Sequence, residues 1–170
     1  MPILALDLGT YLGYAVMASG KAVVYGTKHF VERKATKKHA GDPEGTRFML
    51  ARQFIGSTID TYGAEAVHFE DVHNHTAVGA AHVYGGLRAV MQMACIERGL
   101  PTIGHGVGTI KKFWTGRGNE GKTGMIERAR ALGYPLRDDE DDTADALAIG
   151  HLAESLAPSS SWHDLDGAFS

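Results

Sequence analysis

Cysteine pairs, long apolar runs and an excess of positive charge are all missing from this sequence of 170 residues. Its one cysteine, Cys95, excludes an intrachain disulfide and favours a reducing compartment. No apolar run approaches the ~20 residues that cross a membrane, and the N-terminus lacks a secretory signal pattern, so we expect a soluble, cytoplasmic protein. Lysine and arginine number 17 against 20 aspartates and glutamates, which argues against a generic nucleic-acid binder but leaves room for local basic patches.

What is present is the alternation of patterns typical of an α/β domain. Three short apolar or β-branched runs, separated by turn residues, predict an antiparallel meander over 2–8, 12–18 and 21–30. Helical and strand patterns then alternate, with helices expected at 44–62, 76–97, 123–132 and 139–157 and strands at 66–70 and 102–105. We therefore expect a five-stranded mixed sheet flanked by helices, in one domain over 1–157, followed by a flexible tail at 158–170.

Carboxylates lie at the ends of two predicted apolar strands, which ordinarily carry none. Asp7 ends the first strand and Glu70 ends the fourth, so the two can meet if these strands are neighbours. On the last helix Asp142 and Asp145 are three residues apart and share a face, whereas Asp141 is expected to point away from Asp142. Buried carboxylates repel one another unless a cation neutralises them, and oxygen-only ligands suit Mg²⁺ or Mn²⁺. The pattern predicts a two-metal site for phosphodiester hydrolysis.

Ordinary roles remain open for the same acids. Asp7 could bond the backbone of the turn that follows it, and Glu70 could be a surface acid at a strand end. The acidic residues 138–141 are assigned mainly to the start of the helix, where acidic side chains interact favourably with the helix dipole and cap free N–H groups.

Basic residues gather in two stretches that read as surface. One lies at 33–39, and the other comprises Lys111, Lys112, Arg117 and Lys122 around a glycine-rich loop. A solvated face is the ordinary explanation of such patches, and contact with nucleic-acid phosphates is the functional one.

Three segments together resemble the RuvC Holliday-junction resolvases: Asp7-Leu8-Gly9-Thr10 through Val16, the strand end at Glu70, and Asp142-Thr143-Ala144-Asp145-Ala146-Leu147-Ala148-Ile149. The resemblance implies an RNase H-like fold, a homodimer, and two divalent ions held by Asp7, Glu70, Asp142 and Asp145. It also implies paired cuts in four-way DNA junctions and other branched DNA, leaving 5′-phosphate and 3′-hydroxyl ends. Lys111, Lys112, Arg117 and Lys122 would bind DNA, with Lys122 facing the active site. No membrane and no nucleotide cofactor is expected.

The family usually carries an aromatic wedge after the catalytic glutamate, and here the sequence reads Asp71-Val72-His73-Asn74-His75. His73 or His75 could stack on a base, could be ordinary surface histidines, or, less plausibly, could bind metal. A debranching or RuvX-type nuclease of broader specificity, and a non-catalytic scaffold for branched DNA, therefore stay open. The helix at 76–98 offers an apolar stripe of Val83, Leu87, Val90 and Ala94 as a candidate dimer face, although a core-facing stripe has the same pattern.

Overall fold

The computed structural model of the chain describes residues 1–30, 43–73 and 77–157. Its strands are β1 (Ile3–Asp7), β2 (Tyr11–Ala18), β3 (Lys21–His29), β4 (Ala66–Asp71) and β5 (Thr102–Gly106). Its helices are α1 (Pro43–Tyr62), α2 (Val78–Ile96), α3 (Val107–Thr115), α4 (Lys122–Ala131) and α5 (Asp141–Leu156). The predicted elements are confirmed with small shifts at their ends.

The strands form one mixed sheet in the order β3-β2-β1-β4-β5. The first three strands pair antiparallel, as the turn residues predicted, and β1 pairs with β4 in parallel. This parallel pairing brings the carboxyl ends of β1 and β4 to the same edge of the sheet, because Leu6 lies beside Phe69.

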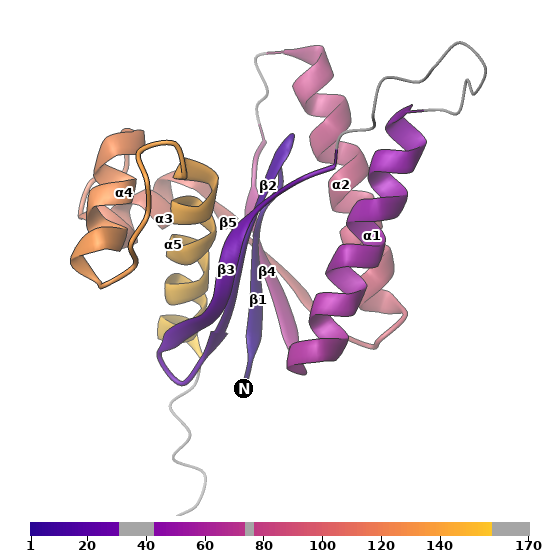
Figure 1. Cartoon of the computed structure of the whole chain (residues 1–170), viewed down its shortest axis with the longest axis horizontal. Coiled ribbons are helices and arrows are strands. Elements are labelled where there is room, and N and C mark those ends of the chain that lie inside the picture. Colours follow the sequence, from indigo (N-terminus) through magenta and orange to yellow (C-terminus); the bar gives the residue numbers. More distant parts are fainter. Residues whose placement is uncertain (31–42, 74–76, 158–170) are drawn as a thin grey trace, which may run out of the picture.

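Helices cover both faces of the sheet (Figure 1). On one face α1 and α2 enclose a core that includes Leu4, Leu6 and Met91. On the other face α5 lies against the sheet with α3 and α4 outside it, around a core that includes Ala5, Ala15 and Ile149. Alternate residues of β1 enter the two cores, and this alternation puts Asp7 on the α5 face, in step with Ile3 and Ala5.

Small residues let α5 approach the sheet closely. A Cβ atom built on Gly13 would lie 1.9 Å from the backbone oxygen of Asp142 and 3.2 Å from the Cβ atom of Asp7. Real side chains do not tolerate the first contact, so only glycine at this point of β2 allows the start of α5 to sit over the end of β1. The helix is buried along most of its length, including Ala144, Ala148 and Gly150.

The predicted dimer stripe on α2 is wrong. Leu87 and Ala94 are fully buried in the core under α1 and α2, and Val83 and Val90 pack against the same core. The stripe is needed inside the subunit and is not free for a partner.

The predicted tail at 158–170 and the basic patch at 33–39 lie outside the described residues. Among the residues that are described, no helix combines the length and the hydropathy needed to cross a lipid bilayer.

Candidate active site

Four predicted carboxylates come from three elements that end or begin at one edge of the sheet. Asp7 is the last residue of β1, and Glu70 is the next residue of β4 after the pair Leu6–Phe69. Asp142 and Asp145 lie on the first turns of α5, whose start rests on Gly13 beside Asp7. All four residues keep intermediate exposure, so an ion or a phosphate from solvent can reach them.

These carboxylates perturb one another. Burial raises the pKa of Asp7 well above its ordinary value, and neighbouring carboxylates raise it further, in decreasing order those of Asp145, Glu70, Asp142 and Asp141. Burial, and next the charge of Glu70, raises the pKa of Asp145 to about 7. Burial is also the main reason why the pKa values of Glu70 and Asp142 are raised. The cluster therefore holds more negative charge than its surroundings neutralise.

A divalent cation fits this donor set. Carboxylate oxygens are hard ligands of the kind that Mg²⁺, Mn²⁺ and Ca²⁺ prefer, and a bound cation would offset both the burial and the repulsion that raise these pKa values. Within the described ranges, no three His, Cys, Asp or Glu side chains are already gathered as a group that could hold a metal ion.

A fifth carboxylate, that of Asp141, also affects the cluster. Its carboxylate forms an ion pair with the ammonium group of Lys122 at the start of α4, and it raises the pKa values of Asp7 and Asp142. Asp141 therefore adds to the electrostatics of the site beside the four predicted carboxylates.

The helix-start role assigned to 138–141 is confirmed only for Asp141, which is an acidic residue of the first turn of α5, and the capping part of that role is wrong. The capping position of α5 is Glu140, whose side chain makes no cap bond. Glu140 instead accepts a hydrogen bond of 2.7 Å from the backbone N–H of Arg137, and Asp138 accepts one from Arg130.

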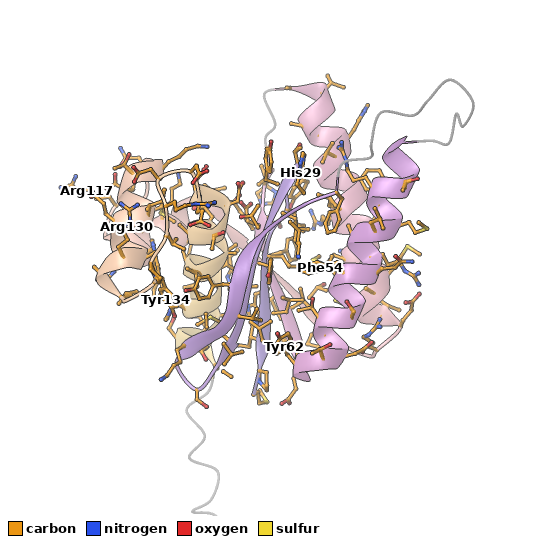
Figure 2. All side chains as sticks on the ribbon, viewed as in Figure 1. His29, Phe54, Tyr62, Arg117, Arg130 and Tyr134 are labelled. Carbon is orange, nitrogen blue, oxygen red and sulfur yellow. The ribbon has the colours of Figure 1, made fainter. Side chains whose placement is uncertain are left out.

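Two of the predicted basic residues lie beside the cluster and two do not. Lys111 on α3 donates a hydrogen bond of 2.8 Å to the carbonyl of Glu120, and its charge lowers the raised pKa values of Glu70 and Asp145. Lys122 acts in the same way on the pKa of Asp142. Lys112 and Arg117 are exposed, and Figure 2 shows Arg117 on the outer side of the α3–α4 layer, away from the sheet.

His73 follows β4 and is exposed, with Nε2 3.9 Å from a carboxylate oxygen of Asp71. It is thus available at the surface near Glu70, as a base-stacking or an ordinary surface residue would be. His75 lies outside the described residues.

A network that the sequence analysis missed holds the strand end that carries Glu70. The hydroxyl group of Tyr84 donates to the carbonyl of Glu70 (3.1 Å) and accepts from the N–H of Val72 (3.1 Å). Arg88, one helical turn further along α2, donates to the Asp71 carboxylate at 3.0 Å. The spacing of Tyr84 and Arg88 on one helical face was the available signal, but the sequence did not say which strand that face would meet.

Comparison with known proteins identifies the family. Residues 3–151 match the family described as crossover junction endodeoxyribonuclease RuvC. The chain belongs to the RuvC family. Members of this family are divalent-metal-dependent endodeoxyribonucleases, and the carboxylate cluster is of the kind that such enzymes require. The chain is 29% identical to RuvC of Corynebacterium efficiens over 154 residues, which are 86% of this chain and 66% of that protein. It is 28% identical to RuvC of Akkermansia muciniphila over 155 residues, 88% of each chain.

Solved structures of RuvC proteins share the fold. Thermus thermophilus RuvC in complex with a Holliday junction substrate superposes with a TM-score of 0.68 at 23% identity, over 89% of this chain and 91% of that one. The yeast mitochondrial Holliday junction resolvase Ydc2 superposes with a TM-score of 0.62 at 12% identity, over 88% of this chain and 77% of that one. The expected RNase H-like fold is thereby confirmed.

Proposed function

We propose that residues 1–157 act as one nuclease domain that resolves four-way DNA junctions by paired phosphodiester hydrolysis, leaving 5′-phosphate and 3′-hydroxyl ends. The observation that carries the proposal is the under-neutralised cluster of Asp7, Glu70, Asp142 and Asp145, formed where β1, β4 and α5 meet. Family membership adds the substrate class, since RuvC proteins are crossover junction endonucleases and the Thermus protein binds a Holliday junction.

The chain's own residues have distinct roles in this proposal. The four carboxylates hold two Mg²⁺ or Mn²⁺ ions, which supply the Lewis acidity that phosphodiester hydrolysis requires. Lys111 and Lys122, at the rim of the cluster, attract the phosphate to be cut and limit the repulsion between it and the carboxylates. Lys112 and Arg117, farther out, contact phosphates along the arms, and His73 contacts DNA near the end of β4.

A homodimer would place two such sites on one junction. The exposed side of α2, opposite the buried stripe, is the candidate interface, because Val78, Met93 and Ile96 are all well exposed there. Gly85 and Ala89 lie between them on the same helical face and would allow a second helix to come close. An Ile96→Asp variant should dissociate to monomers in analytical ultracentrifugation, whereas a wild-type monomer at micromolar concentration contradicts the proposed dimer.

The function is tested by cleavage of a synthetic four-way junction beside linear duplex, three-way and flap DNA, with Mg²⁺, Mn²⁺ or chelator. Symmetric, metal-dependent nicks in the four-way junction, lost in Asp7→Asn, are the expected result. Equal cutting of flaps and three-way junctions would indicate a general debranching nuclease, and binding without cutting in either metal would contradict an enzymatic role. The cytoplasmic location expected from the sequence stays a prediction.

A further inference from the structure

An exposed pair of aromatic rings lies at the same end of the sheet as the carboxylate cluster. Tyr11 begins β2 and His29 ends β3, and the two residues are partners across the strands. Their rings are stacked, with centroids 4.3 Å apart and planes at 24°. Tyr11 is 51% exposed, which is unusual for a large aromatic side chain in a sheet whose other residues on this face are mostly covered.

The strand register places this pair on the face that carries the cluster. Gly13 lies beside Asp7 and faces the start of α5, and Tyr11 is two residues away on the same strand, so its side chain stands on the same face. Thr27, two residues before His29 on β3, bonds Thr143 of α5 through its hydroxyl group (2.8 Å). The two rings therefore lie on the face of the sheet that α5 covers, just beyond the first turn of that helix (Figure 2 labels His29 at this end).

A hollow of about 560 Å³ opens beside Tyr11, of a size that ligand pockets commonly have. Tyr11 and Thr27 form its wall on the sheet side, and Lys122, Asp141 and Asp142 connect it to the cluster. His29 covers the side of the Tyr11 ring toward β3, so the other side is directed toward β1, the strand that carries Asp7.

The charged residues around the hollow favour the binding of an uncharged nucleobase over the binding of a phosphate. Arg137 is engaged by Asp139 at 3.2 Å and by Glu140 at 3.4 Å, and Lys122 is paired with Asp141. With Asp142 also present, the carboxylates outnumber the cations on this rim. A phosphate would meet net repulsion here, whereas a planar, uncharged ring gains from stacking on an aromatic side chain.

We propose that Tyr11, backed by His29, is a stacking platform for one unpaired or splayed nucleobase of the strand whose phosphate enters the carboxylate cluster. The platform rests on the proposed function and adds to it a second point of contact that fixes the strand next to the bond to be cut. A pair that only stabilises the hairpin of β2 and β3 would give the same stacked geometry, so the test has to depend on the base.

Tyr11→Leu keeps an apolar residue suited to a strand but removes the aromatic face, and Tyr11→Phe keeps that face without the hydroxyl group. Tyr62 at the opposite end of the sheet is also exposed, and Tyr62→Leu is the matched control (Figure 2). Affinity for a four-way junction is measured in EDTA, so that no metal-dependent cutting interferes. Single abasic sites are then scanned through the nucleotides around the junction centre.

Removal of the platform should weaken junction binding by about 5- to 150-fold, the range found when one base–aromatic stack is lost, while Tyr11→Phe and Tyr62→Leu stay near wild type. The loss in Tyr11→Leu should disappear at one abasic position, where wild type and variant bind equally. A Tyr11→Leu variant with a lower melting temperature but the same affinity for every junction would show a purely structural pair and overturn the platform. A wild-type protein that binds no branched DNA would instead overturn the proposed function itself.

Discussion

Neutralising one carboxylate of the cluster should stabilise the metal-free protein while destroying its activity. In Asp145 the pKa is raised from the model-compound value of 3.8 to about 7, first by burial and then by Glu70. A carboxyl group whose pKa is higher in the folded state keeps its proton longer there, so stability falls as pH rises from 3.8 to about 7. That difference corresponds to about 4 kcal/mol at most, and the partial exposure of the site reduces it to about 2 kcal/mol.

Asp145→Asn removes this penalty. In EDTA at pH 8 the free energy of unfolding of the variant should be about 2 kcal/mol higher than that of wild type. This corresponds to a rise in melting temperature of about 4–8 °C for a chain of this size. At pH 5 the advantage should shrink to about a third, because wild-type Asp145 is then mostly protonated in the folded state. The matched control is Asp139→Asn at the same end of the molecule, where the side chain is 77% exposed and paired with Arg137, and no stabilisation is expected.

Added Mg²⁺ should reverse the order. Wild type gains stability from the bound cation in proportion to the logarithm of its concentration above the dissociation constant, and the variant, which lacks a ligand, gains less. Thermal melts at several Mg²⁺ concentrations measure both effects, and junction cleavage measures activity. A variant that is less stable than wild type in EDTA at pH 8 would refute the idea that burial and neighbouring carboxylates penalise the ionised form of Asp145.

Three further predictions test the surroundings of the site. Gly13→Ala should push α5 away from β2 and lower both the melting temperature and the cleavage rate. The control Gly79→Ala, where a Cβ atom meets nothing within 4 Å, should change neither, and equal effects of the two variants would contradict the close approach of α5 to β2. Lys112→Gln should reduce the slope of log affinity against log salt concentration by about 0.9 without changing Mg²⁺ binding, whereas the control Lys21→Gln, at the far end of the sheet, should leave the slope unchanged. An unchanged slope in Lys112→Gln would show that Lys112 does not contact DNA. Burial and the charge of His105 lower the pKa of His68 to about 4, so the protein should lose stability as pH falls from about 6.5 toward 4. The urea midpoint of His105→Gln should decline less over this range than that of wild type, and an equal decline in both proteins would contradict the prediction.

The sheet and the acidic site could be predicted because both follow from local patterns. Strand runs with turn residues between them determined the meander of β1 to β3, and carboxylates at the ends of buried strands marked the edge where β1 and β4 meet. The spacing of Asp142 and Asp145 placed both acids on one helical face without knowledge of the partner elements.

What failed depended on contacts between distant elements. The α2 stripe could not be assigned from the sequence because this helix has apolar residues on opposite faces, with Leu87 buried and Ile96 exposed, and helical periodicity alone does not say which face meets the core. The ion pair of Asp141 was missed because it depends on Lys122, which comes from a separate helix. The Tyr11–His29 pair depends on the register of β2 and β3, which spacing along the chain leaves undetermined.

The charge distribution also implies an order of binding. Lys111 is anchored by the Glu120 carbonyl and Lys122 by Asp141, so neither ammonium group is free to sit among the carboxylates around Asp7. A DNA phosphate that approached this site without a cation would add negative charge to a cluster that already resists ionisation. The outer contacts, by contrast, need no metal, because Lys112 and Arg117 are exposed and have no contribution to the pKa values of the four carboxylates. Junction DNA should therefore bind in EDTA through its arms and the Tyr11 platform, and the scissile phosphate should enter the cluster only together with divalent cations.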